Sequence, residues 1–136
     1  MNFLFLLSFL FGPLPTSKVS LTVNVSGFSD NVGKSYIALY RPKDVWPEIN
    51  KQFIGKVVAI NGKTSTVKFD NLECGTYAVA VFHDRNNNGK LDKNMLGIPV
   101  ERYGFSNNAR ETFSAPSFGS ASVELQKDRA IAIFVK

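Results

Sequence analysis

Short runs of β-strand pattern, separated by turn-forming residues, are the feature that most limits what this chain can fold into. From Val19 to Ser26 apolar residues alternate strictly with polar ones, which is the pattern of a strand with one buried face and one wet face. No stretch shows the period of an amphipathic helix. About seven strands are predicted, at residues 19–25, 34–40, 53–60, 64–69, 76–82, 121–125 and 130–135.

This arrangement predicts an all-β fold. More narrowly, it predicts a single antiparallel β-sandwich with Greek-key connections, of the prealbumin-like or immunoglobulin-like kind. With 136 residues the chain is long enough for one domain with a core. The runs at 34–40 and 76–82 are apolar on both faces, so we expect both to be central strands. Residues 95–118 lack any period and predict a long irregular loop before the last two strands.

Shorter signals mark the connections between these strands. Asn61-Gly62 is a strong hairpin signal between the third and fourth predicted strands. Residues 41–52 contain two prolines and mixed charges, and they predict a crossover connection that Trp46 pins to the sheets. Cys74 is the one cysteine and lies beside a predicted turn, where a lone cysteine is usually a small buried apolar residue.

The N-terminal segment has the composition of a secretory leader. Residues 1–11 are almost entirely apolar, residues 12–17 are small or turn-forming, and no residue among them is charged. The apolar run is shorter than the roughly 20 residues of a membrane-spanning helix. We therefore expect residues 1–17 to be a cleaved signal peptide and residues 18–136 to be one exported domain, periplasmic or secreted, without a stable membrane span. The alternatives are a truncated start and a buried first strand.

Oxygen-bearing side chains alternate along the segment that follows the strand predicted at 76–82. Alternate oxygen ligands followed by a glycine turn, here Gly89, are how a short loop wraps a hard cation such as Ca²⁺. The candidate ligands are Asp84, Asn86, Asn88, the backbone carbonyl of Lys90, and Asp92. Met95 stands where an EF-hand loop has its bidentate glutamate, so this segment is not an EF-hand.

With two carboxylates in the loop, we expect weak calcium binding, with a dissociation constant of roughly 10⁻⁴ to 10⁻³ M. Glu101 and Asp44 are the acidic residues that would complete the coordination. The alternative is a metal-free polar loop, because Asn, Asp and Gly favour turns without any ion.

A second candidate site lies in the long segment that is rich in aromatic residues. Its side chains predict a groove for a sugar or a peptide, and the alternative is that they cap the open end of the sandwich. The candidate ligand-surface residues are Tyr103, Phe105, Asn107, Asn108 and Arg110, with Phe113 and Phe118 as further aromatic residues of the groove.

Enzyme and nucleic-acid chemistry have little support in the sequence. One histidine and one cysteine are too few for a zinc cluster, and no nucleophile elbow is present. A Ser–His–Asp triad would need Ser106, His83 and Asp84, and a small hydrolase is the least favoured interpretation. The net charge is +5, but the basic residues are scattered among acids. Nucleic-acid binding is therefore not expected, and attraction to an anionic envelope surface is the milder interpretation.

Two motifs resemble known families. The motif Phe69-x-x-Leu72-x-x-Gly75-x-Tyr77-x-Val79 resembles the turn-and-strand signature of prealbumin-like and collagen-adhesin B-type sandwiches. Together with residues 83–92, Leu96-Gly97-Ile98-Pro99 and residues 103–108, it makes the chain from about Val19 to Lys136 resemble the bacterial family called domain of unknown function 2141. The resemblance implies a small exported protein with a signal peptide and a sandwich fold, and it implies no particular activity.

The sequence thus predicts an exported, non-enzymatic β-sandwich module for binding or structure, with a weak Ca²⁺ loop at residues 84–92. The alternative is a metal-free structural envelope protein. We expect a monomer whose partner is an envelope protein or a glycan.

Overall fold

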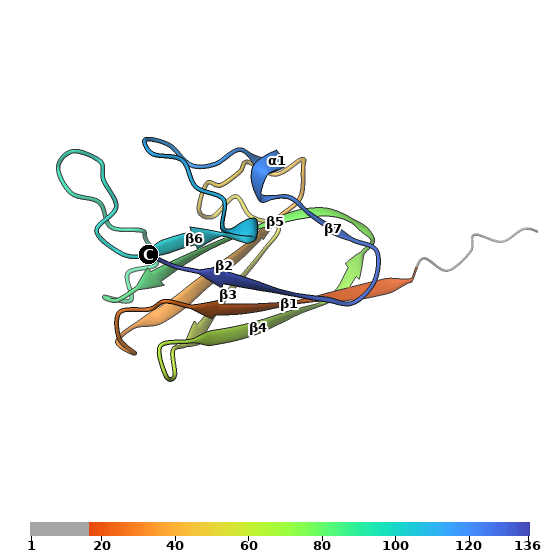
Figure 1. Ribbon diagram of the computed structural model, residues 1–136, viewed down its shortest axis with the longest axis horizontal. Helices are drawn as coiled ribbons and strands as arrows, with labels where there is room; N and C mark the ends of the chain where they lie inside the picture. The colour runs from red at the N-terminus through yellow and green to blue at the C-terminus, as the bar shows by residue number, and fades with distance from the viewer. Residues whose placement is uncertain (1–16) are drawn as a thin grey trace, which may run out of the picture.

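The computed structural model describes residues 17–136, which form an all-β fold of two sheets, as the sequence predicts (Figure 1). The strands are β1 (Lys18–Ser26), β2 (Lys34–Tyr40), β3 (Ile54–Ala59), β4 (Ser65–Glu73), β5 (Gly75–Asp84), β6 (Tyr103–Phe105), β7 (Val123–Leu125) and β8 (Arg129–Phe134). Two short turns of helix are present, η1 (Ser106–Asn108) and α1 (Phe118–Ala121). The predicted leader lies outside the described residues except for Ser17. Within residues 17–136 no helix is long and apolar enough to cross a membrane.

The two sheets share one hydrophobic core. The smaller sheet has the strand order β4-β1-β8, and the larger has the path β3-β2-β5-β6, with β7 paired to the start of β5. The alternation predicted for β1 directs Leu21, Val23 and Val25 into this core, where they meet Val79 and Val81 of β5. Each such side chain is almost completely buried, which stabilises the fold by about 1.5–3 kcal/mol per residue.

Strand β5 is central in the larger sheet, as its two apolar faces predict. It pairs with β2 on one side and with β6 and β7 on the other. Its outer face carries Ala78, Ala80 and Phe82, and Phe82 stacks on Tyr36 of β2 with ring centroids 4.8 Å apart. The larger sheet therefore has an apolar outer face as well as an apolar inner face.

The prediction of a purely antiparallel fold is wrong at one pair of strands. Strand β8 pairs with β1 in parallel, from Leu21 opposite Arg129 to Ser26 opposite Phe134. The preceding strand, β7, belongs to the larger sheet, so the chain crosses between the sheets after Leu125 and enters the smaller one in the direction of β1. An apolar-polar alternation contains no information on strand direction.

The segment predicted to be an irregular loop contains an eighth strand. Strand β6 is three residues long, too short for a visible alternation, and pairs with the middle of β5. It also joins the two sheets, because Tyr103 and Lys136 exchange backbone hydrogen bonds of 3.4 and 3.2 Å beyond the end of β8. At Gly104 a side chain would collide with the carbonyl oxygen of Phe134, only 2.9 Å from a Cβ, so this close approach needs glycine.

The hairpin signal at Asn61-Gly62 produces its turn but not a hairpin within one sheet. Asn61 and Thr64 exchange backbone hydrogen bonds of 2.9 and 3.1 Å. The strands on either side nevertheless belong to different sheets, β3 to the larger and β4 to the smaller. The residues of the turn determine where the chain reverses. Which sheet each strand joins depends on packing against the shared core.

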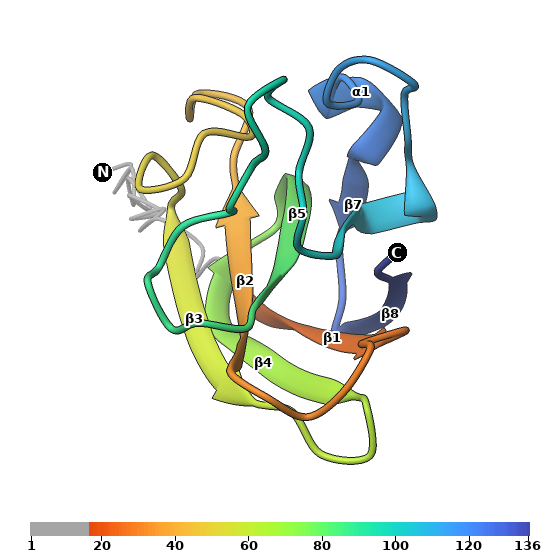
Figure 2. The same cartoon turned by 90° about the vertical axis from the view of Figure 1, so that its left-hand side faces the viewer.

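Three connections lie next to one another beside the outer face of the larger sheet. They are the β2–β3 segment at residues 41–53, the β5–β6 segment at 85–102, and residues 109–117 before α1. In Figure 2 the segments at 41–53 and 109–117 lie at the upper end of the molecule, and the segment at 85–102 passes in front of β2 and β3 and then rises between the other two segments.

Candidate functional site

Asp84, the last residue of β5, organises the acidic loop, which we define as residues 84–92. Its side chain is buried, and its two carboxylate oxygens accept the backbone N–H groups of Asn88, at 3.1 Å, and Gly89, at 2.8 Å. A short acidic side chain that accepts from residues four and five positions later closes a tight turn. The first predicted calcium ligand therefore also fixes the shape of the loop.

Glu101 is the second carboxylate at the base of this loop. It is buried and accepts the backbone N–H groups of Arg85, at 2.8 Å, and Asp92, at 2.9 Å, so it ties the two ends of the loop together. Glu101 and Asp44 are the two acidic residues predicted from the sequence to complete a cation site. The structure brings Glu101 to the loop and places Asp44 in a separate ion pair with Arg41, at 3.0 Å.

Asp92 holds the two asparagine side chains of the loop. Its carboxylate accepts the amide N–H groups of Asn88, at 2.8 Å, and Asn86, at 2.6 Å. These hydrogen bonds, that from Asn88 first, hold the pKa of Asp92 below its usual range. Lys90 contributes a backbone N–H, 2.9 Å from the side-chain oxygen of Asn88.

The predicted ligand residues are thus neighbours, but their carboxylates bond to peptide and amide N–H groups. In the part of the chain that the structure describes, no three His, Cys, Asp or Glu side chains are grouped to hold a metal ion. The donor set of carboxylates, amide oxygens and one carbonyl is nevertheless the set that Ca²⁺ prefers.

The acidic loop rests on the turn between β1 and β2. Arg85 and Asp30 form an ion pair of 2.7 Å, and the backbone N–H of Val32 and the Arg85 guanidinium keep the pKa of Asp30 low. A side chain at Gly33 would collide with the carbonyl oxygen of Asp84. His83 is fully buried, and its Nε2 lies 2.6 Å from the carbonyl oxygen of Val32. This histidine is a structural link between the turn and the loop.

The residues of the conceivable hydrolase triad are each bonded elsewhere. Ser106 is buried and its hydroxyl accepts the backbone N–H of Val79, at 2.9 Å, while it donates to the carbonyl of Ala121. His83 is held by Val32 and Asp84 by its own loop. Among the hydrogen bonds of residues 17–136, none joins two members of this triad.

A groove of about 1060 Å³ lies beside the acidic loop, over the outer face of the larger sheet. Its floor is formed by β5 and β6, and its walls are the three connections seen in Figure 2. The floor includes Ala80, Phe82, Tyr103 and Phe105, and the walls include Trp46–Asn50, Gly89–Leu91, Lys93, Leu96–Pro99 and Glu111–Ala115. The wall from Gly89 to Leu91 is part of the acidic loop, so the two features share residues.

Trp46 packs one wall against the sheet, as the sequence predicts. Its ring lies 5.0 Å from that of Tyr40, 5.6 Å from Phe105 and 5.9 Å from Phe118, measured between centroids. Its indole N–H donates to the carbonyl oxygen of Pro116 at 2.8 Å. The first and third connections are therefore fixed to each other across the sheet.

The predicted ligand-surface residues are divided by the structure. Tyr103 and Phe105 line the groove, and the Arg110 guanidinium stacks over the Tyr103 ring at 4.4 Å. Asn107 donates to the carbonyl oxygens of Ser120 and Ser122, and Asn108 accepts the backbone N–H of Phe134. The two asparagines support the backbone of neighbouring segments and do not line the groove.

Sequence reasoning named Phe113 as a groove residue but missed the apolar wall at residues 96–99. Leu96, Ile98 and Phe113 line the groove and are exposed. The available signal was the placing of large apolar side chains in segments otherwise rich in Gly, Asn, Ser and Pro. Such segments are usually polar when they are only connections.

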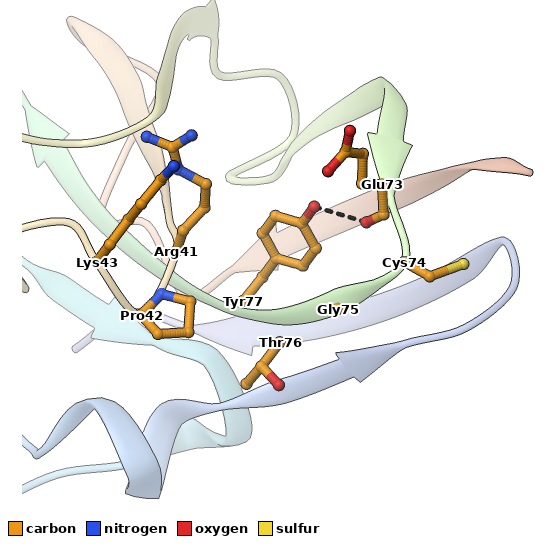
Figure 3. A pocket seen from close by; sticks show the side chains of 8 residues that line it. All are labelled: Arg41, Pro42, Lys43, Glu73, Cys74, Gly75, Thr76 and Tyr77. Carbon is orange, nitrogen blue, oxygen red and sulfur yellow. Dashed lines mark hydrogen bonds between the residues drawn. The ribbon is translucent and has the colours of Figure 1, made fainter. Parts of the chain in front are cut away.

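A smaller hollow of about 300 Å³ lies near the start of β5, between Arg41 and Cys74 (Figure 3). The prediction that Cys74 is buried is wrong, because its side chain is exposed. Figure 3 shows its thiol pointing away from Arg41 and Lys43, and the Tyr77 hydroxyl donating to the carbonyl of Glu73 at 2.6 Å. No cationic group of this hollow faces the thiol in a way that would activate it.

The comparisons with known proteins give one match. A family model described as an uncharacterized protein conserved in bacteria (DUF2141) matches residues 23–132, most of the chain. No curated protein and no solved structure matches.

Proposed function

The chain belongs to the DUF2141 family of bacterial proteins, and from this premise we propose that it is an exported, non-enzymatic binding module whose acidic loop takes up Ca²⁺ weakly. In this proposal the protein is a monomer that binds a ligand or partner in the cell envelope. Its two sheets form a Greek-key sandwich of the prealbumin-like kind. Export is supported by the uncharged apolar run at residues 1–11.

The observation that carries the calcium proposal is that three carboxylates bond to N–H groups of one loop, although within residues 17–136 they are not grouped around a common point. Asp84 and Asp92 lie within the loop, and Glu101 binds the peptide groups at both of its ends. Rotating the Asn86 amide by half a turn exchanges nitrogen for oxygen and turns an oxygen toward Asp92, whereas the Asn88 oxygen already accepts the Lys90 N–H. Oxygen atoms at such separations repel unless a cation lies between them, so calcium binding and amide rotation go together.

In this proposal calcium neutralises the carboxylates of Asp84 and Asp92 and makes the acidic loop more rigid. Asp84, Asn86, Asn88, Asp92 and the Lys90 carbonyl would hold it, with Glu101 positioning the loop. One wall of the groove would then be more ordered, because Gly89–Leu91 belong to both features. The cation is thus structural, and the groove is the binding surface.

A calcium titration of thermal unfolding tests the proposal. With a dissociation constant of roughly 10⁻³ M or below, 10 mM Ca²⁺ adds about 1.4 kcal/mol or more to the free energy of unfolding, which raises Tm by about 5 °C. Asp92→Asn should remove the response, whereas Asp70→Asn, an exposed aspartate on β4, should keep it. An identical Tm in EDTA and in 10 mM Ca²⁺ would show that the loop takes no calcium.

A metal-free structural protein is the second candidate. It is favoured by the hydrogen bonds from Asn86 and Asn88 to Asp92 and by the ungrouped acidic side chains within residues 17–136. In this case Asp92→Ala lowers Tm equally in EDTA and in calcium, because the loop loses the same two hydrogen bonds in both.

A further inference from the structure

We infer that the groove over the larger sheet binds the hydrocarbon chain of a single-chain amphiphile whose head group is uncharged or zwitterionic. The inference rests on the proposal that the protein is a binding module, and it names the class of ligand. It does not depend on calcium.

Three of the exposed large apolar side chains, those of Leu96, Ile98 and Phe113, line the groove. Among the described residues, the largest exposures of big apolar side chains are those of Met95, 104%, Phe113, 99%, and Leu96, 83%. Leu96 and Phe113 line two different walls of the groove, on the segments before and after β6 respectively. A hydrocarbon chain laid between them would remove both side chains from water.

This exposure is built into an ordered turn. The Asn94 side chain accepts the backbone N–H groups of Leu96, at 2.9 Å, and Ile98, at 3.1 Å. Backbone hydrogen bonds join Asn94 to Ile98, at 2.8 Å, and Val100 to Asp92, at 2.9 Å. The wall is therefore a closed hydrogen-bonded hairpin that presents its apolar side chains to the groove.

The groove floor favours a hydrocarbon over a glycan. Ala80, Phe82 and Phe105 contribute apolar surface to the floor, where Ala80 is paired directly opposite Phe105. The indole N–H of Trp46 already donates to Pro116. Buried sugar hydroxyls need several hydrogen-bond partners at the floor of a site, and each one left without a partner costs affinity.

The charges around the groove favour a head group without net charge. Lys90 and Lys93 lie on one wall, and Glu48 and Glu111 lie on the others. The two positive and two negative charges cancel, so the groove has no net charge to attract an anionic or a cationic head. A neutral or zwitterionic head can remain in water at the open side while the chain occupies the floor.

Trp46, the only tryptophan of the chain, lines the groove and reports its occupancy. We would titrate the full chain with dodecylphosphocholine below its critical micelle concentration and follow Trp46 fluorescence, in EDTA and in calcium. The expected result is saturable binding, no change with phosphocholine alone, and weaker binding of dodecyl sulfate and dodecyltrimethylammonium. Binding of the head group alone, or preference for either charged chain, would overturn the inference.

The double variant Leu96→Ser/Phe113→Ser should weaken dodecylphosphocholine binding at least about tenfold, since two apolar contacts are lost. The matched control is Val32→Ser/Val57→Ser, which removes exposed apolar side chains that do not line the groove. Equal loss in both variants would overturn the inference, as would binding of phosphatidylcholine vesicles but not of the monomeric amphiphile, or concentration-dependent dimerisation that buries Trp46. Absence of amphiphile binding together with a calcium-dependent Tm would refute this inference alone.

Discussion

The connection between β5 and β6 has two halves that place their side chains in opposite ways. In residues 84–92 the polar side chains bond within the loop: buried Asp84 and exposed Asn88 accept backbone N–H groups, and Asn86 and Asn88 donate to Asp92. In residues 93–100 the backbone is equally ordered, but the large apolar side chains turn outward. Both halves are continuous in sequence and both line the same groove.

The polar side chains of residues 84–92 contribute to the stability of the fold, whereas the exposed apolar side chains of residues 93–100 do not. The buried carboxylates of Asp84, within the first half, and of Glu101, which follows the second half, accept backbone N–H groups of the first half. The exposed apolar side chains of the second half are largely in contact with water, where polar side chains would be better solvated. An ordered turn that displays apolar side chains therefore points to a ligand.

Removal of Glu101 should have the largest effect and tests whether the first half is structural. Glu101→Ala leaves the backbone N–H groups of Arg85 and Asp92 without an acceptor, which lowers the free energy of unfolding by about 2–4 kcal/mol. Urea unfolding measures this value. Glu101→Gln keeps one acceptor and should lose about half as much, and a negligible loss in Glu101→Ala would remove the distinction between the two halves.

An intermediate loss of stability is expected when the Arg41–Asp44 ion pair is removed. This pair lies in the same connection as Trp46. Hydrogen bonds from the Arg41 guanidinium hold the pKa of Asp44 below its usual range. The contribution of this pair to stability is therefore complete above the unfolded pKa of about 3.9 and is lost as the pH falls through the lower folded pKa.

Asp44→Asn should accordingly reduce stability at pH 6 and make the fall in stability between pH 5 and pH 3 less steep than in the natural chain. The loss should be smaller than that of Glu101→Ala, because both partners of the pair are near the surface. Unfolding curves at each pH provide the measurement. A parallel pH dependence for the two proteins would show that Asp44 does not anchor this connection.

The smallest effect on stability is expected in the outward half. Leu96→Ser/Phe113→Ser should change the free energy of unfolding by no more than about 0.5 kcal/mol, since both side chains are already in water. Urea unfolding of the same preparation used for amphiphile titration checks this directly. A loss of more than about 1 kcal/mol would mean that these residues support the fold.

The sequence predicts the strands well where the core determines the pattern. The alternation in β1 and the apolar faces of β2 and β5 follow from burial, and those predictions are confirmed. The parallel direction of β8 and the separation of β3 from β4 depend on contacts between segments far apart, which no local pattern contains. Strand β6 was missed because three residues cannot show a period.

The acidic loop was also visible in the sequence, because its side chains bond to groups only a few residues away. Asp84 and Asp92 each find partners within the loop. The sequence predicts a groove at the aromatic segment but not its other walls, because these come from connections that meet only in the folded chain. Asn107 and Asn108 illustrate the same limit, since the backbone groups that they bond belong to α1 and β8 and their neighbours.

The pairing of β1 with β8 has a consequence for the order in which the chain can fold. Ser20 donates its backbone N–H to Asp128 at 2.9 Å, a contact across 108 residues. The edge of β1 that pairs with β8 therefore stays unpaired during synthesis until Arg129–Phe134 have left the ribosome. Such distant pairing slows folding to the range of milliseconds to seconds. Removing the last strand should therefore leave a chain that begins to fold but exposes an unpaired edge for association with other chains.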